Sequence, residues 1–280
     1  MRGQLPFSQV DVFASGSISG NPVAVIHNAE ALSDSEMAAV ARWTNLSETT
    51  FLLKPTKPGA DYRLRIFMPT GELPFAGHPT LGSAYAWLAN GGVPASSEHI
   101  VQECGIGLVK VRRDGNTMGF LAPELLRGGE LDDETSQKMI RALKVDPEKV
   151  LAANWIDNGP GWMGFVLPSA EDVLALRPDF VAMDHAHVGV IGKHAPGGPA
   201  DYEVRALVPD ISNGEDPATG SLNASFAVWL TRAKLAPPSY SVRQGTVIQR
   251  EADLHVTTEP SGDIWVSGKC NRIIEGQITI

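Results

Sequence analysis

Cysteine is scarce in this chain. Its two cysteines, Cys104 and Cys270, lie far apart and belong to no paired-spacing motif. A secreted disulfide scaffold and a thiolate zinc site are therefore not expected. We expect a reduced protein in the cytoplasm.

Long apolar runs and an excess of basic residues are also missing. No stretch approaches the roughly 18 consecutive apolar residues of a membrane-spanning helix, and residues 1–12 lack the apolar run of a signal peptide. Lysine and arginine together number 23 against 32 acidic residues, which gives a formal net charge of −9. We therefore expect neither membrane insertion nor a nucleic-acid partner.

An internal repeat is present in the chain. RIFMPTGELPFAGHPTLGSAYAWL, from Arg65, is similar to RALVPDISNGEDPATGSLNASFAVWL, from Arg205. GNPVAVIHNAEAL, from Gly20, is similar to GWMGFVLPSAEDVL, from Gly161. Matched residues lie 140 to 143 positions apart. Two segments that share nearly one offset indicate a duplicated fold, with halves at residues 1–125 and 126–280.

Alternating apolar patterns predict strands in both halves. A capping box, Ser33 to Glu36, predicts a helix over residues 34–43, and the pattern predicts another over 133–143. The predicted strands cover residues 7–13, 23–27, 49–53, 62–68, 99–103, 108–112, 117–121, 150–156, 163–167, 188–191, 202–207, 241–244, 253–258, 264–267 and 273–278.

Two further helices are predicted over residues 79–89 and 221–231, one in each repeated segment. Both are apolar or small on every face, so both need protein around them on all sides. Small residues such as Gly82 and Ala224 would let strands approach closely. The sequence therefore predicts an α+β fold in which each half curls a sheet around one buried helix.

Both buried helices are preceded by glycine-containing turns, Ala76-Gly77-His78-Pro79 and Asp216-Pro217-Ala218-Thr219-Gly220-Ser221. A helix N-terminus presents unpaired N–H groups and suits a carboxylate or phosphate. If the halves face each other, both N-termini would point at one cleft. The alternative is that glycine and proline only begin the helices. The difference between His78 and Asp216 at equivalent positions favours a functional role.

Several segments together carry a family resemblance: VDVFASGSISGNPVAVI from Val10, NLSETTFLL from Asn45, GHPT, EDPATGS and QGTVIQREADLHV. In this order they resemble the PhzF-like phenazine-biosynthesis family. The resemblance implies a diaminopimelate epimerase-like fold, with two pseudo-symmetric halves and often a homodimer. It also implies that the last strand, near residues 273–280, returns to the first half.

The resemblance further implies an isomerase that shifts a proton without a metal or an organic cofactor. Glu48 would be the acid and base, and His78 and Asp216 would hold and polarise the substrate. Three residues at the helix starts would contact a small carboxylate substrate: Gly77, Gly220 and Ser221.

Read from its surroundings alone, Glu48 stands between a capped helix and an apolar strand. Burial there would raise the pKa of its carboxyl group toward the range that suits proton transfer. The alternative is an exposed glutamate in a turn. Related epimerases use two cysteines at the helix starts, where neither Cys104 nor Cys270 lies, so a two-thiol racemase mechanism is excluded.

Three other features of the sequence have simpler interpretations. His185, His187 and His194 form a possible metal cluster, but we prefer surface or packing histidines. Ser221 lacks the Gly-x-Ser-x-Gly pattern of a serine hydrolase. Tryptophans 155, 162 and 265 receive no role.

Three hypotheses of function follow. The first is an isomerase of a small carboxylate, similar to the family's trans-2,3-dihydro-3-hydroxyanthranilate isomerase. The second is an epimerase or racemase of an amino-acid-like compound, which needs the same base. The third is a non-catalytic small-molecule binder.

Overall fold

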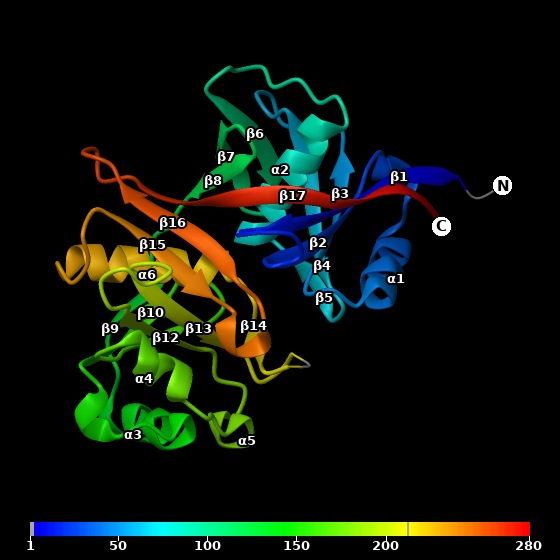
Figure 1. The fold of residues 1–280 in the computed structure, drawn as a ribbon. Helices are drawn as coiled ribbons and strands as arrows, with labels where there is room; N and C mark the ends of the chain where they lie inside the picture. Colours follow the sequence, from blue (N-terminus) through cyan, green and yellow to red (C-terminus); the bar gives the residue numbers. More distant parts are fainter. Residues whose placement is uncertain (1–2, 212) are drawn as a thin grey trace. The chain divides into compact units, whose positions relative to one another are not determined.

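The computed structural model describes residues 3–211 and 213–280. The chain forms two compact units: Met1–Leu121 with Ser267–Ile280, and Ala122–Val266. Each unit contains strands with one buried helix, α2 or α6, and further helices on the outside (Figure 1). The chain passes from the first unit to the second after Leu121 and back again after Val266.

The first unit is built mainly of antiparallel strands. Its elements are β1 (Gln4–Val12), β2 (Asn21–Ile26), η1 (Ala29–Ala31), α1 (Asp34–Thr44), β3 (Thr49–Leu53), β4 (Tyr62–Met68), β5 (Gly71–Leu73), α2 (Gly77–Ala89), β6 (His99–Cys104), β7 (Gly107–Asp114) and β8 (Thr117–Leu121), and it includes most of β17 (Ile264–Thr279).

The second unit has the same kinds of element. They are β9 (Arg127–Glu130), α3 (Asp133–Leu143), η2 (Pro147–Lys149), β10 (Ala152–Asp157), β11 (Met163–Val166), α4 (Ala170–Ala175), α5 (Phe180–Met183), β12 (Val188–Lys193), β13 (Tyr202–Leu207), β14 (Glu215–Asp216), α6 (Gly220–Arg232), β15 (Ser239–Gln244), η3 (Thr246–Ile248) and β16 (Ala252–Thr258).

The order of strand pairings is repeated in the two units. In the first, β1 and β2 are antiparallel, β2 and β3 parallel, β3 and β4 antiparallel, and β4 pairs with β5 antiparallel and with β6 parallel. In the second, β10 to β15 pair in the same succession and with the same directions. The repeat seen in the sequence therefore corresponds to a repeated topology.

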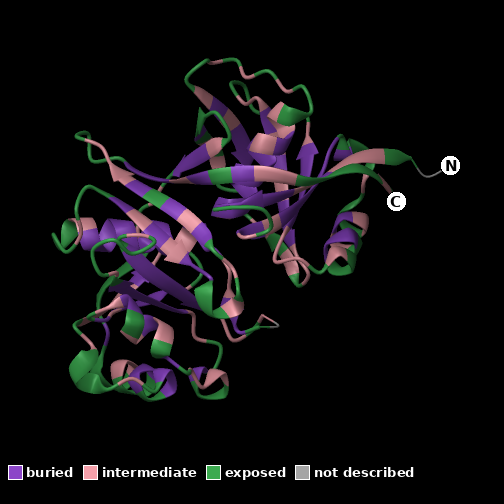
Figure 2. Cartoon of the chain, in the orientation of Figure 1, coloured by how far each residue is buried: buried purple, intermediate pink, exposed green. Residues whose placement is uncertain are grey.

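The two predicted buried helices are α2 and α6. Helix α2 contacts β1 to β4 and β6 to β8, and α6 contacts β10 and β16. Most residues of both helices are buried (Figure 2). A Cβ atom at Gly82 would lie 2.4 Å from Cγ1 of Val23, so glycine allows α2 to approach the sheet closely. The predicted curled sheet around a central helix is what each unit shows.

Amphipathic helices cover the outer face of each sheet. Met37 and Val40 of α1 pack against Phe51 and Phe67 in the first unit, and residues of α3, α4 and α5 form a larger cluster in the second. The capping box predicted at Ser33 and Glu36 is present, with both of its hydrogen bonds. Helix α1 runs one residue further than predicted, to Thr44.

The predicted C-terminal strands, 264–267 and 273–278, are wrong as two elements. They form one strand, β17, which pairs antiparallel with the full length of β1, from Gln4 opposite Thr279 to Val12 opposite Cys270. The register of this pairing shifts between Gln9, which lies opposite Ile274, and Val10, which lies opposite Arg272. Long-range pairing overrides the weak strand pattern of residues 268–272.

Five short elements of the structure were not predicted. Strands β5, β9 and β14 and helices α4 and α5 have two to six residues each. Such lengths are too short for a periodic pattern to stand out. The start of α4 does carry a signal, because the Ser169 hydroxyl accepts a hydrogen bond from the backbone N–H of Asp172.

Candidate functional site

Glu48 lies in the short segment between α1 and β3. Helix α1 ends at Thr44 with Asn45 in the left-handed conformation, which turns the chain toward β3. The side chain of Glu48 is 13% exposed. It is therefore largely buried, unlike the exposed turn glutamate that was the alternative.

His78 is the second residue of α2 and lies against Glu48. Nε2 of His78 is 3.4 Å from Oε2 of Glu48, and the His78 side chain is 5% exposed. The two residues are 30 positions apart in the sequence, and the fold of the first unit brings them together. The structure thus places two of the three predicted catalytic residues in direct contact.

The imidazole of His78 is neutral at ordinary pH. Burial lowers its pKa from 6.5 to about 3, while a hydrogen bond to the backbone of Pro22 acts weakly in the opposite direction. The contact with Glu48 is therefore not an attraction between two full charges. A neutral ring can accept a proton at one nitrogen while it donates from the other, and so can polarise a substrate group without carrying charge itself.

A loop ordered by Asp11 supplies the other neighbour of His78. The Asp11 carboxylate accepts hydrogen bonds from the backbone N–H groups of Ser19 and Gly20. Gly20 is required there, because a Cβ would lie 2.0 Å from the carbonyl oxygen of Val12. The next residue is Asn21, whose Nδ2 lies 3.4 Å from Nδ1 of His78. The VDVFASGSISGNP segment therefore ends by packing against the candidate site.

The second unit repeats this arrangement with different chemistry. The Asp157 carboxylate accepts hydrogen bonds from the N–H groups of Gly159 and Gly161, and the residue after Gly161 is Trp162. Nε1 of Trp162 donates a hydrogen bond of 3.1 Å to Oγ of Ser221, the second residue of α6. Trp162 and Ser221 thus correspond to Asn21 and His78. This contact of Trp162 was not predicted from the sequence.

The first turns of α2 and α6 carry no side-chain cap. The residues before them are Ala76 and Thr219, and within the described chain neither makes a side-chain hydrogen bond to its helix. The N–H groups at Gly77 and Gly220 therefore lie where the helix dipole favours an anion. Such N–H groups suit a carboxylate, and the contact of these helix starts with a substrate remains a prediction.

Asp216 ends the short strand β14, four residues before α6 begins. The Thr219 hydroxyl donates a 2.5 Å hydrogen bond to Oδ2 of Asp216. The preceding residue, Glu215, forms a buried ion pair with Arg205 of β13, 2.8 Å between Oε2 and Nη2. Asp216 and the start of α6 thus belong to one hydrogen-bonded segment of the second unit.

The Arg205–Glu215 pair has a counterpart in the first unit. There Arg65 of β4 binds Glu72 of β5 through two hydrogen bonds, of 2.7 and 2.6 Å, and also binds Asp34. The repeated arginine and glutamate of the sequence are therefore an ion pair that ties each short strand to its neighbour, just before the buried helix.

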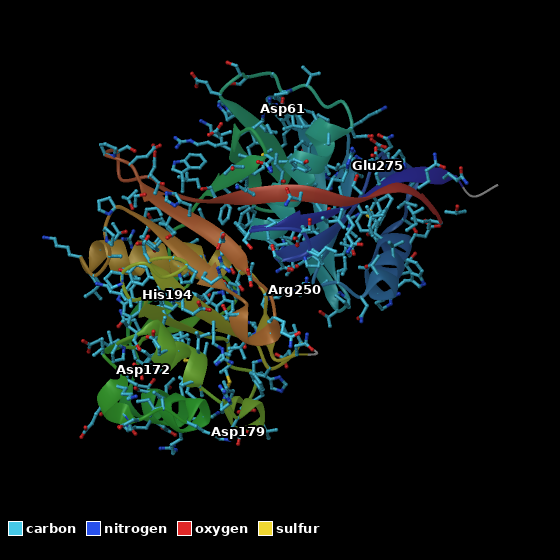
Figure 3. All side chains as sticks on the ribbon, viewed as in Figure 1. Asp61, Asp172, Asp179, His194, Arg250 and Glu275 are labelled. Atoms are coloured by element: carbon cyan, nitrogen blue, oxygen red, sulfur yellow. The ribbon has the colours of Figure 1, made fainter. Side chains whose placement is uncertain are left out.

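The histidines considered for a metal site are dispersed. Nε2 of His194 lies 3.0 Å from Oε2 of Glu203 (His194 is labelled in Figure 3), and the His185 ring contacts the Asp210 carboxylate. The ring of His187 lies 5.3 Å from that of Trp162. Among residues 3–211 and 213–280, no group of three or more potential ligands is arranged to hold a metal ion.

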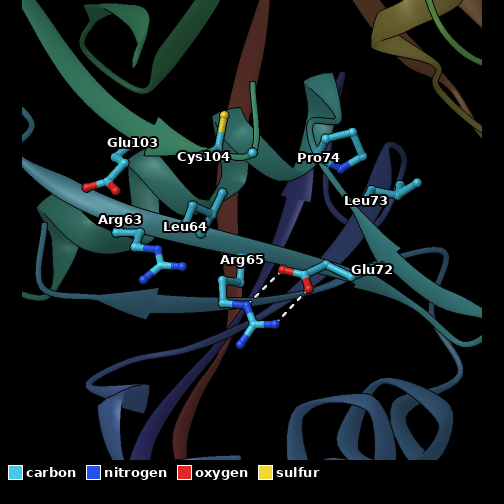
Figure 4. A pocket seen from close by; sticks show the side chains of 9 residues that line it. Arg63, Leu64, Arg65, Glu72, Leu73, Pro74, Glu103 and Cys104 are labelled. Atoms are coloured by element: carbon cyan, nitrogen blue, oxygen red, sulfur yellow. Dashed lines mark hydrogen bonds and ion pairs between the residues drawn. The ribbon is translucent and has the colours of Figure 1, made fainter. Parts of the chain in front are cut away.

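A cavity of about 410 Å³ lies on the first unit, and none of the predicted site residues is among the residues that line it (Figure 4). Three of its charged groups have partners. Arg65 binds Glu72, and the Glu103 carboxylate accepts hydrogen bonds from the backbone N–H groups of Thr56 and Lys57. Burial raises the pKa of the Cys104 thiol, which also lines the cavity, so this cysteine is mainly protonated at neutral pH.

Three neighbours of the predicted site residues were not predicted: Asn21, Trp162 and Gln244, whose Nε2 donates a hydrogen bond to the carbonyl oxygen of Asp216. Asn21 and Gln244 both stand in motifs quoted for the family resemblance, next to glycines, and that position was the available signal. Their partners are remote in the sequence, so no spacing rule could reveal the contacts.

No helix in the described ranges is long and apolar enough to cross a membrane.

Known proteins are similar to this chain over most of its length. Residues 10–276 match the sequence model of PhzC-PhzF, the phenazine biosynthesis-like protein family. Antisense-enhancing sequence 1 of Schizosaccharomyces pombe is 37% identical, with 97% of each chain covered. Trans-2,3-dihydro-3-hydroxyanthranilate isomerase of Pseudomonas aeruginosa is 32% identical, with 96% of this chain and 97% of the relative covered.

Solved structures extend the similarity to the fold. A PhzF-family phenazine biosynthesis protein of Enterococcus faecalis superposes with a TM-score of 0.80 at 26% identity, covering 99% of this chain and 100% of the other. A hydroxyproline epimerase of Agrobacterium vitis has a TM-score of 0.58 at 14% identity, covering 98% of this chain and 91% of the other. The predicted α+β, epimerase-like fold is confirmed.

Proposed function

The chain belongs to the phenazine biosynthesis-like PhzC-PhzF family and is an isomerase, and we propose that it moves a proton between carbon atoms of a small carboxylate. Glu48 is the acid and base in this proposal. His78 and Asp216 hold and polarise the substrate, and Gly77, Gly220 and Ser221 contact its carboxylate.

The observation that carries the proposal is the 3.4 Å contact between Glu48 and the neutral ring of His78. A largely buried carboxyl group beside a reacting carbon can take up a proton from one position and deliver a proton to another. The neighbouring ring adds no positive charge that would hold Glu48 permanently ionised. The pair thus supplies a proton carrier next to a polarising group.

The helix starts provide the second part of the proposed chemistry. Removal of a proton beside a carboxylate leaves an enol-like anion, which N–H groups at a helix N-terminus stabilise. Glu48 then returns the proton to a different carbon, which shifts a double bond. Because only a proton moves, the proposed reaction requires no organic cofactor.

The substrate class in this proposal is that of the relatives named trans-2,3-dihydro-3-hydroxyanthranilate isomerase. Epimerisation of an amino-acid-like compound is the second candidate. A Pseudomonas aeruginosa protein with a TM-score of 0.77 and 27% identity is described as a predicted epimerase. Return of the proton to its original carbon, on the opposite face, would give this outcome.

Deuterium incorporation from heavy water tests the proposal. The purified protein is incubated with trans-2,3-dihydro-3-hydroxyanthranilate and with a pool of small carboxylates, and mass spectrometry locates any deuterium. Wild type is compared with Glu48→Gln, and Glu124→Gln is the control because the Glu124 side chain is 79% exposed.

We expect incorporation with wild type and with Glu124→Gln, and its loss with Glu48→Gln. Deuterium at a new carbon indicates isomerisation, and deuterium at the original carbon indicates epimerisation. Incorporation that survives Glu48→Gln would remove Glu48 from its role. Binding without any incorporation would favour the non-catalytic binder.

Two further expectations remain predictions: the cytoplasmic location and the homodimer. Light scattering coupled to size-exclusion chromatography checks the second. A mass near twice 29.9 kDa would support the dimer, and a mass near 29.9 kDa would contradict it.

A further inference from the structure

We infer that Gln244 is a positioning residue, which fixes the Asp216 carboxylate and the start of α6 through one buried amide group. This inference rests on the proposed function, because it assigns Gln244 a part in presenting Asp216 to the substrate. Gln244 is the last residue of β15 and is fully buried.

The Gln244 amide uses its full hydrogen-bonding capacity on this segment. Nε2 donates to the carbonyl oxygen of Asp216 and to Oγ1 of Thr219, both at 2.9 Å. Oε1 accepts from the backbone N–H of Thr219 at 3.2 Å and from Nδ2 of Asn223 at 2.8 Å. An amide side chain has two N–H donors and two acceptor lone pairs, and all four are occupied.

The partners allow only one orientation of this amide. Two donors, from Thr219 and Asn223, face Oε1, and the Asp216 carbonyl oxygen faces Nε2. An amide rotated by 180° would place its N–H groups against the donors of Thr219 and Asn223 in a buried environment, which would destabilise the folded protein. Gln244 therefore holds the chain from Asp216 to Asn223 in a single arrangement.

The network ends on the Asp216 carboxylate. The Thr219 hydroxyl accepts from Gln244 Nε2, and its single proton points to Oδ2 of Asp216. This orientation keeps Oδ2 in an accepting role and restrains the position of that oxygen. Gln244 is thus linked to Asp216 in two ways: directly, through the backbone carbonyl oxygen of Asp216, and indirectly, through the hydroxyl group of Thr219.

The first unit contains a matched glutamine with a different task. Gln102 of β6 lies 142 positions before Gln244 and is also fully buried. Its Nε2 donates to Oγ1 of Thr80 and its Oε1 accepts from the hydroxyl of Tyr62, both at 3.0 Å. Neither bond reaches the residues before α2. The bonds to the Asp216 segment therefore distinguish Gln244 from its counterpart.

The two glutamines give a matched test. Gln244→Glu and Gln102→Glu each bury one new carboxylate, so both carry a similar general cost to stability. At position 102 the new carboxylate can accept hydrogen bonds from the hydroxyl groups of Thr80 and Tyr62. At position 244 it faces the Asp216 carbonyl oxygen and competes with Asp216 for the single proton of Thr219.

The measurements are kcat and KM for the carboxylate that exchanges deuterium with wild type. We expect Gln244→Glu to lower kcat/KM at least tenfold relative to Gln102→Glu, with both variants assayed below their thermal midpoints. Thr219→Val should cause a loss of the same order, Thr219→Ser should restore most of it, and the double variant Gln244→Glu with Thr219→Val should lose little more.

Equal kcat/KM for the two glutamine variants, or multiplicative losses in the double variant, would overturn the inference. If Gln244→Glu does not fold, the two variants at Thr219, which introduce no charge, provide the test. Equal kcat/KM for Thr219→Val and Thr219→Ser would overturn the inference.

Failure of the proposed function is separable from this outcome. If wild type exchanges no carboxylate, hydrogen exchange of residues 215–222 replaces kinetics as the readout. Faster exchange in Gln244→Glu than in Gln102→Glu would support the positioning, and equal exchange would overturn it.

Discussion

The amide nitrogen of Asn21 lies 3.4 Å from Nδ1 of His78, on the opposite side of the ring from Glu48. The His78 ring is thus held between an amide and a carboxyl group, both on segments outside its own helix. Trp162 and Ser221 repeat this relationship in the second unit. The duplicated fold therefore keeps the contact and changes the residues that make it.

Removing the amide of Asn21 should impair catalysis. In Asn21→Leu the ring of His78 loses a polar neighbour worth about 1 kcal/mol, so we expect kcat to fall about five- to tenfold. Steady-state kinetics on the exchanging substrate measure the effect. Ser8→Ala is the control, since Ser8 makes a 3.1 Å hydrogen bond to His27, a buried histidine outside the site. An equal loss of kcat in both variants would contradict the role of Asn21.

Acid should destabilise the protein through His78. The unfolded chain takes up a proton at this residue below pH 6.5, whereas the folded chain does so only near a pKa of about 3. Protons therefore favour unfolding as the pH falls from 6.5 toward 3, and the loss at pH 5 is about 2 kcal/mol. Urea unfolding at pH 7 and pH 5 measures it, with wild type compared with His78→Gln.

The variant should show a smaller pH dependence, because glutamine does not titrate. His255→Gln is the control, since His255 is exposed. His27, whose pKa is lowered by burial to about 4, should remain as a second acid-sensitive group in both variants. An unchanged pH dependence in His78→Gln would show that His78 is not buried as described.

The repeated arginines should differ in their contribution to stability. Arg205→Met leaves Glu215 buried without its partner, and the side chains of this pair are 3% and 2% exposed. We expect its free energy of unfolding to fall by about 3–5 kcal/mol. Arg65→Met breaks a pair whose glutamate is 40% exposed, for which about 1 kcal/mol or less is expected. Similar losses in chemical denaturation would contradict this difference.

Gly105 should be intolerant of a side chain. A Cβ there would lie 2.6 Å from Cα of Pro74, which precedes the start of α2. We expect Gly105→Ala to cost about 1–3 kcal/mol in stability, and to lower activity because Pro74 leads into Gly77 and His78. Gly71→Ala is the control, because nothing lies within 4 Å of its Cβ position. Thermal unfolding and kinetics of both variants measure the effect.

Much of the fold could be predicted from local patterns. Strands β3, β4, β8 and β13 and helix α3 have the predicted bounds, because alternation and capping are properties of a few neighbouring residues. The buried helices were predictable for a similar reason. A segment without a polar face, such as residues 221–231, is stable only inside protein.

The candidate site could be predicted only in part. Glu48, His78 and Asp216 were found through motifs, and the geometry of their surroundings was not. The neighbours that hold them, such as Asn21 beside His78 and Gln244 beside Asp216, are polar residues of ordinary type. Their role depends on which strands lie beside each other.

The sequence by itself determined the duplication, the two buried helices and the turns before them. These features depend on repeated segments, on the spacing of apolar residues and on the residue types at a helix N-terminus, all of which can be recognised in short stretches of sequence. Only the tertiary structure decided that β17 is one strand paired with β1, that Glu48 meets His78, and that one amide of Gln244 fixes Asp216. These contacts join residues 28 or more positions apart, and their free energy comes from burial and strand pairing that no local pattern contains.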